Sequence, residues 1–203
     1  MKHLMKRIAL FTLTVLTLAS ILPTAALADT RTELVTVAAS SLEAPRISRI
    51  SIPLLNKINY ALKVYNFLKD SRFKNGTAWA GSKRPQLSTW SCKGCMAYAV
   101  DFCKYVYGAD WASSPKKFQT YKKVSEIETG DAIRIDGHYF VVLQRKGDKL
   151  YTAEGSYSSK VRASLATYGY YIKDNQLYQN RYNSKGVSTG SVKVTFVSGY
   201  RFK

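Results

Sequence analysis

The chain has 203 residues, with 31 Lys or Arg against 13 Asp or Glu and a net charge of +18 at pH 7. This length suits one domain with a hydrophobic core of its own. The chain contains only two histidines, His3 and His138, and this excludes any site that needs more than two imidazoles.

Residues 1–28 have the layout of a secretory signal peptide. Three basic residues precede an apolar run from Ile8 to Leu22, and small residues at 26–28 suit a signal peptidase. The alternative is a retained membrane anchor, but the run is short for a helix that spans a bilayer. We expect a mature chain that begins at Asp29, is secreted and extracellular or associated with the cell wall, and has no transmembrane segment.

The charge of this mature chain predicts its partners. Removing the signal peptide takes away three basic and no acidic residues, so the net charge becomes +15. A positive field of this size attracts polyanions. For an exported protein we expect anionic cell-wall polymers or lipid head groups rather than nucleic acid. The alternative is that the charge only keeps the protein soluble.

The region before the cysteines divides into two segments. Residues 29–50 are small and polar without a clear period, which predicts a flexible N-terminal segment. Over residues 51–75 apolar side chains recur at spacings of three and four, which predicts an N-terminal helix that begins near Pro53. We expect this helix to pack beside a domain formed by residues 76–203, or to guard it.

All three cysteines lie in the stretch from Trp90 to Gly108. From Met96 onward the apolar residues recur at helical spacing, and Gly108 stands where helices are often closed by a residue with positive φ. Cys95 would lie in the first turn, where the helix dipole favours a thiolate. We interpret Cys95 as a nucleophile, and His138 as its base because His3 falls in the predicted signal peptide.

The segment around His138 reads as a pair of antiparallel strands. His138 opens the apolar run 139–143, and turn residues at 147–148 lead into the run 150–154, which ends at Glu154. The two ends should meet, so the Glu154 carboxylate would hold the second ring nitrogen of His138. Asp136 and a backbone carbonyl are the alternatives, and Asp131 is interpreted as a turn residue.

The loop ahead of Cys95 holds three further candidates. Trp79 and Trp90 would either wall a substrate groove or cap the core. Gln86 is a possible oxyanion donor, supported only by its spacing.

The other two cysteines allow several readings. Cys92 and Cys95 form a C-x-x-C pair that could close into a disulfide or act as a redox couple, which makes Cys92 a possible redox partner. Cys103 would lie about 12 Å from Cys95 along the helix axis, too far for both to bind one zinc ion. We therefore interpret Cys103 as a buried apolar residue and expect neither a metal nor a cofactor.

Four short motifs, in this order, resemble those of papain-like cell-wall hydrolases, the CHAP amidases and the related NlpC-type peptidases: Gly94–Ala99, Gly130–Asp131, Gly137–Val142 and Glu154–Tyr157. The resemblance covers residues 77–165. It implies an α+β, papain-like fold in which the helix that carries the cysteine packs on a small antiparallel β-sheet.

The resemblance also implies roles for three residues: Cys95 as nucleophile, His138 as base and Glu154 as the orienting group. Two features depart from it. Many NlpC-type enzymes have Asp-Cys-Ser around the nucleophile, where this chain has Gly94, Cys95 and Met96, and Cys92 has no counterpart.

We therefore expect a secreted cysteine hydrolase that cleaves amide or peptide bonds, with peptidoglycan as the first candidate substrate. One alternative is a transglutaminase-like acyl transferase that uses the same three residues. The other is a non-catalytic basic surface protein built on a papain-like fold.

Overall fold

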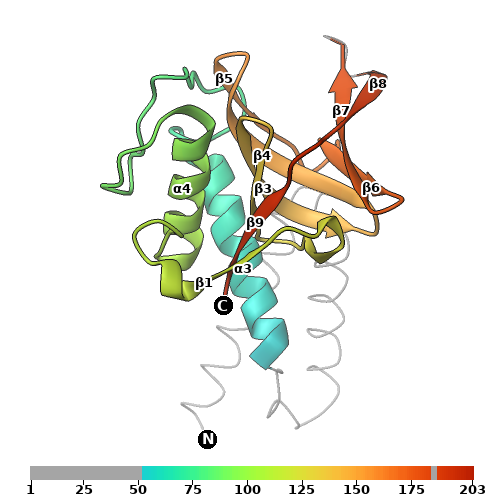
Figure 1. Cartoon of the computed structure of the whole chain (residues 1–203). Coiled ribbons are helices and arrows are strands. Elements are labelled where there is room, and N and C mark those ends of the chain that lie inside the picture. Colours follow the sequence, from blue (N-terminus) through green and yellow to red (C-terminus); the bar gives the residue numbers. More distant parts are fainter. Residues whose placement is uncertain (1–51, 184–186) are drawn as a thin grey trace, which may run out of the picture. The chain divides into compact units, whose positions relative to one another are not determined.

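The computed structural model describes residues 52–183 and 187–203 (Figure 1). The predicted signal peptide, residues 1–28, and the predicted flexible segment, residues 29–50, lie outside the described residues. The described chain is of mixed α+β class, with two α-helices and an antiparallel sheet of nine strands. Residues from Tyr60 to Lys203 form one compact unit.

The helices are α3 (Ile52–Lys69) and α4 (Gly94–Tyr107), with short 3₁₀ turns at η1 (Pro115–Lys117) and η2 (Val124–Glu126). The strands are β1 (Phe118–Tyr121), β2 (Ala132–Ile135), β3 (His138–Lys146), β4 (Lys149–Tyr157), β5 (Lys160–Ala163), β6 (Tyr170–Lys173), β7 (Gln176–Tyr182), β8 (Ser188–Lys193) and β9 (Ser198–Phe202). The strands follow one another across the sheet in the order β1-β9-β2-β3-β4-β6-β7-β8, and β5 pairs with β4.

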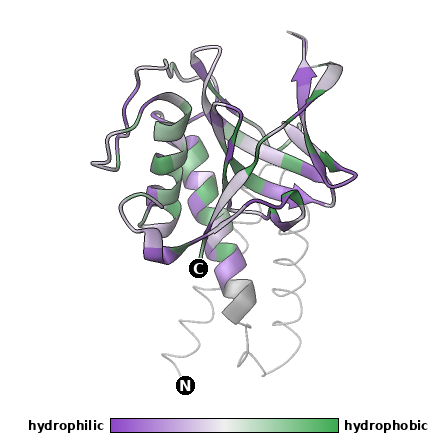
Figure 2. Cartoon of the chain, in the orientation of Figure 1, coloured by the Kyte–Doolittle hydropathy of each residue, from purple (hydrophilic) through white to green (hydrophobic). Residues whose placement is uncertain are grey.

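The sheet separates two apolar clusters. On one side α4 packs on β3 and β4, and Val141 and Ala153 face the helix. Phe140 and Leu150 alternate with them along the strands and belong to the second cluster. Figure 2 shows green hydrophobic residues along α4, and its residues 97–103 are all buried, as expected for a helix covered on more than one side.

Helix α4 agrees with its prediction. Its buried residues include Ala97, Val100 and Cys103, which lie at spacings of three on one side. It ends at Gly108, whose φ is 71° and whose N–H donates to the Lys104 carbonyl at 3.0 Å. The predicted left-handed cap is therefore confirmed.

Helix α3 is shorter than predicted, because it ends at Lys69 and the chain then turns through residues 70–76. From Tyr60 onward it belongs to the compact unit. Phe67 is fully buried, with its ring centroid 4.5 Å from that of Phe73 and 5.3 Å from that of Phe102 on α4. These aromatic contacts fix the second half of α3 against α4.

The C-terminal strands differ from their prediction. Alternation of Val192, Val194 and Phe196 predicts one strand with one face on the core, but β8 ends at Lys193 and all its residues are exposed. Only Val194 is buried, whereas Val192 and Phe196 are each 40% exposed. The reason is that neither face of β8, an edge strand, is covered by the core.

Among the described residues, no helix combines the length and the apolar character that crossing a bilayer would require.

Replacing Phe67 tests whether α3 is part of the folded unit. Phe67→Ala should lower the free energy of unfolding by about 3–5 kcal/mol, because it removes a fully buried ring and leaves a cavity. Urea denaturation measures this loss. Tyr65→Ala, at a half-buried position of the same helix, is the control and should cost clearly less. Equal small losses would mean that α3 is not packed on α4.

Candidate active site

Gly94 shapes the start of α4 just ahead of the predicted nucleophile. Its φ is 59°, in the left-handed region that side chains disfavour. A Cβ at this position would stand 3.2 Å from the Gly81 carbonyl oxygen and 3.2 Å from Ser156 Oγ. The next residue, Cys95, is half-buried in the first turn, where backbone N–H groups have no acceptor within the helix.

The structure brings Cys95 and His138 together, although forty-three positions separate them in the sequence. The Cys95 thiol and the His138 imidazole lie near enough to shift each other's pKa, and the backbone N–H groups of Tyr139 and Met96 also act to lower the pKa of the thiol. His138 lies at the first residue of β3, as predicted. The helix start therefore supplies the sulfur and the strand start supplies the ring.

The second ring nitrogen of His138 faces a buried carboxylate. His138 Nε2 lies 2.5 Å from Glu154 Oε2, which leaves Nδ1 for the cysteine. Glu154 lies in β4 and is completely buried. Strand β4 pairs with β3, the strand of His138, with Val141 opposite Ala153. The structure thus brings Cys95, His138 and Glu154 together, with His138 bonded to the carboxylate and close to the thiol.

Arg162 completes this chain, and sequence reasoning missed it. Its Nε donates to Glu154 Oε1 at 2.6 Å, and Nη2 forms an ion pair with the same oxygen. Tyr170 adds a hydroxyl donor to Oε2 at 3.3 Å. Arg162 lies directly across from Glu154 in the β4–β5 pairing. The pairing of opposite charges across β4 and β5 could have identified Arg162, but only if the register between the two strands had been known.

The charges of the site favour a thiolate beside an imidazolium. Burial disfavours the thiolate, but the hydrogen bond and charge of His138, with the backbone N–H groups of Tyr139 and Met96, outweigh it and lower the pKa of Cys95 from its ordinary value. Burial also disfavours the imidazolium, yet hydrogen bonds to Cys95 and Glu154 raise the pKa of His138 to about 9. Burial opposes the charge on Glu154 as well, and His138 and Arg162 still keep its pKa below the usual range.

The two tryptophans of the preceding loop occupy different environments. Trp79 is fully buried, and its Nε1 donates to the Gly94 carbonyl at 2.8 Å, so it caps the core and does not wall a groove. Trp90 is half-buried and packs edge-on against Trp111 at 6.3 Å. Trp111 in turn stacks on Tyr139, next to His138. Trp90 therefore remains a candidate for the wall of a groove.

The loop is tied to α4 by a buried carboxylate. The backbone N–H groups of Gln86 and Leu87 both donate to Asp101, at 2.7–2.9 Å. Asp101 lies about 9 Å beyond Cys95 along the helix axis. Gln86 is itself exposed, so its role as an oxyanion donor stays a prediction.

Two other acidic residues take structural positions. Asp136, the alternative partner for His138, instead accepts bonds from the backbone N–H and the hydroxyl of Thr195. Asp131 is predicted to be a turn residue, but it is completely buried and also makes contacts between strands. It accepts the Tyr121 hydroxyl and pairs with Arg201, so it links β2 to β1 and β9.

All three cysteines are free thiols, so the possible Cys92–Cys95 disulfide is not formed. Burial raises the pKa of Cys92 to about 11, which keeps this thiol neutral. Cys103 is completely buried in the core, as predicted. Within the described part of the chain, no group of three or more His, Cys, Asp or Glu side chains is arranged to hold a metal ion.

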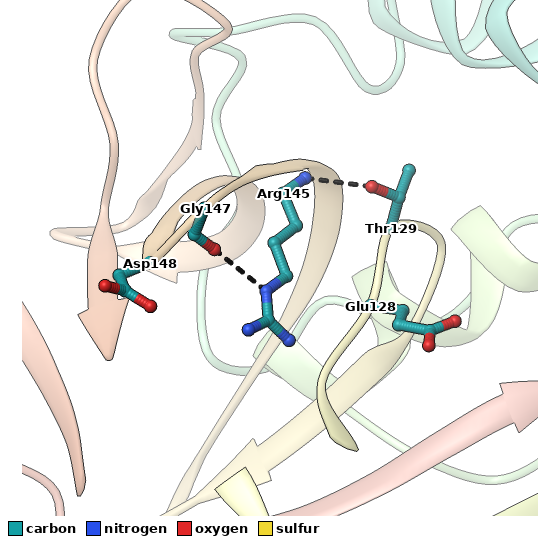
Figure 3. A pocket seen from close by; sticks show the side chains of 5 residues that line it. All are labelled: Glu128, Thr129, Arg145, Gly147 and Asp148. Carbon is teal, nitrogen blue, oxygen red and sulfur yellow. Dashed lines mark hydrogen bonds between the residues drawn. The ribbon is translucent and has the colours of Figure 1, made fainter. Parts of the chain in front are cut away.

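A surface pocket of about 500 Å³ lies elsewhere (Figure 3). Its lining comprises Glu128, Thr129, Arg145, Gly147 and Asp148. The Arg145 guanidinium is used within the fold, with Nε donating to the Gly147 carbonyl at 2.9 Å and Nη1 bonded to the carbonyls of Ser125 and Ile127. None of the candidate catalytic residues contributes to this pocket.

Comparison of the chain with family models, with curated proteins and with solved structures finds no match.

Alkylation tests the thiolate. Iodoacetamide should label Cys95 selectively at mildly acidic pH, because His138 lowers its pKa, while Cys92 and Cys103 are buried and neutral. In His138→Ala the onset of labelling should move to higher pH, because the thiolate loses the charge and hydrogen bond of His138 while burial still opposes it. Mass spectrometry of the labelled peptides measures the labelling of each cysteine in the wild-type protein and in His138→Ala. Slow, equal labelling of all three thiols would contradict the ion pair.

A second test concerns the charge on Glu154. The imidazolium of His138 should persist below pH 9 and be lost as the pH rises through about 9. Glu154→Gln removes the carboxylate but keeps the shape, so the pKa of His138 should fall by at least about one unit. An NMR titration of the His138 imidazole resonance measures this pKa. Asp136→Asn is the control, because that carboxylate bonds Thr195 and not His138. An unchanged pKa would mean that Glu154 is uncharged.

Proposed function

We propose that this protein is a cysteine hydrolase that cleaves amide or peptide bonds, with Cys95 as nucleophile, His138 as acid–base group and Glu154 as the orienting carboxylate. One observation carries the proposal: the His138 imidazole, bonded to the buried Glu154 carboxylate, lies beside the Cys95 thiol, so that the pKa of the thiol is lowered and that of the imidazole is raised to about 9. Paired shifts of this kind are typical of activated cysteine nucleophiles.

The proposed reaction starts from the thiolate–imidazolium pair. The Cys95 sulfur attacks the carbonyl carbon of the amide, and the electron pair of the carbonyl moves to oxygen. The backbone N–H of Cys95, in the first turn of α4, is suited to bind this oxyanion. His138 then gives its proton to the leaving amine, and a thioester remains on Cys95.

Release of the acyl group reverses the proton movement. Neutral His138 takes a proton from water as the water attacks the thioester, and the thiolate leaves. Glu154 keeps the ring in one orientation and compensates its positive charge in both halves of the cycle. Arg162 acts through Glu154 as a positioning residue.

The fold supports a narrower proposal about the class of hydrolase and its substrate. A cysteine at the start of a helix, packed on an antiparallel sheet whose strand begins with the histidine, is the arrangement expected of papain-like cell-wall hydrolases. We infer that peptide cross-bridges or stems of peptidoglycan are the substrates. The surplus of basic residues supports a secreted enzyme held on an anionic wall.

Acyl transfer is the second candidate, because the same thioester can be attacked by an amine instead of water. The observation that favours this variant is a pair of apolar side chains, half-buried Trp90 and buried Trp111, which stacks on Tyr139. Apolar side chains beside the site keep water from it. Adding hydroxylamine or an amine to the reaction separates the two outcomes.

Digestion of purified peptidoglycan tests the proposal. The protein should release new amine termini, identified by mass spectrometry, and Cys95→Ala or His138→Ala should lower the rate on the order of 10³-fold or more. Cys92→Ser is the matched control and should keep most of the activity, because its thiol is neutral and not needed as a nucleophile. An inactive wild-type protein, or activity that survives Cys95→Ala, would refute the mechanism.

A further inference from the structure

A row of lysine and tyrosine side chains crosses one face of the sheet from β3 to β8. Lys146 pairs directly with Lys149, and Lys149 pairs with Tyr171. Tyr171 then pairs with Tyr178, and Tyr178 with Lys193. Directly paired residues of antiparallel strands point to the same face. These five residues, here called the Lys–Tyr row, therefore form a continuous line across five strands.

The Lys–Tyr row lies on the open face of this part of the sheet. Lys149 and Lys193 are exposed and the two tyrosines half-buried, whereas Leu150 and Leu177 on the reverse face are completely buried. Figure 1 shows β6, β7 and β8 on the side of the drawing opposite α4, which covers the sheet at β3 and β4. The row spans four strand spacings, or about 19 Å.

The tyrosine rings are packed against one another. Tyr171 and Tyr178 stack with centroids 5.2 Å apart, and Tyr168 meets Tyr171 edge-on at 6.3 Å. Lys149 Nζ lies 5.0 Å from the centroid of the Tyr168 ring. The ring faces are therefore partly covered, and the surface offers ammonium groups, hydroxyl groups and ring edges.

We propose that the Lys–Tyr row binds an extended polyanion that is rich in hydroxyl groups, such as an acidic glycan or a polyol phosphate. The lysines match carboxylates or phosphates along the polymer, and the tyrosines match its hydroxyl and C–H groups. Single-stranded nucleic acid fits less well, because its bases need free aromatic faces on which to stack. The row includes none of Cys95, His138 and Glu154, so this inference goes beyond the proposed hydrolase.

Fluorescence anisotropy with defined polymers tests the inference, using the protein with Cys95→Ala so that no substrate is cut. The probes are labelled polygalacturonate, polyglycerol phosphate, oligo(dT) and neutral dextran, at low salt. Lys149→Gln with Lys193→Gln should weaken binding of at least one of the first two by about 10-fold. Lys122→Gln with Lys123→Gln changes the charge equally at exposed positions outside the row, and should weaken it less than about 2-fold.

The preferred probe identifies the acidic group of the ligand, carboxylate or phosphate. Equal weakening by the two double variants would overturn the proposal, because it would mean attraction by net charge alone. Absence of binding to both polyanions, or tighter, row-dependent binding of oligo(dT), would also overturn it. None of these results depends on whether Cys95 hydrolyses an amide, so the two proposals fail separately.

Discussion

A carboxylate without access to solvent holds the candidate site together. Removing Glu154 from water is costly unless its charge is compensated, and the fold compensates it from two sides with His138 and Arg162. Each cation satisfies a different oxygen, and Tyr170 supplies a further hydroxyl. The ring orientation of His138 and the ionisation of Cys95 both follow from this arrangement. The β4–β5 hairpin is fixed by the same charges, since Arg162 reaches Glu154 from β5.

Local sequence patterns account for the elements that carry the site. Apolar spacing and Gly108 predict α4, and the runs around His138 and Glu154 predict β3 and β4. The small number of histidines then pairs Cys95 with His138 without any knowledge of the fold. These inferences succeed because they depend on residues close in sequence, or on a composition that offers a single choice.

The remainder depends on contacts between distant residues, and the sequence does not reveal them. The role of Arg162 requires the register between β4 and β5. Burial of Trp79 follows from its contact with Gly94, fifteen positions away, and Asp101 is explained only by the loop that folds back to it. Alternation around Val192 misled because both faces of β8 are exposed, and periodicity does not show whether any element covers the apolar face.

Strand β4 carries both surfaces to which we assign a function. Glu154 and Lys149 are five positions apart on it, which corresponds to about 17 Å. Because five is an odd number, the two side chains point to opposite faces of the sheet, so β4 separates the Lys–Tyr row from the buried carboxylate.

The position of β9 bears on how the chain folds. This strand lies between β1 and β2, although it follows β2 by more than sixty positions. That side of the sheet remains incomplete until residues 198–202 have been made, because β1 pairs with β9 alone. Pairing between residues so far apart in sequence slows folding, because β1 gains its partner only after the strands between have been ordered.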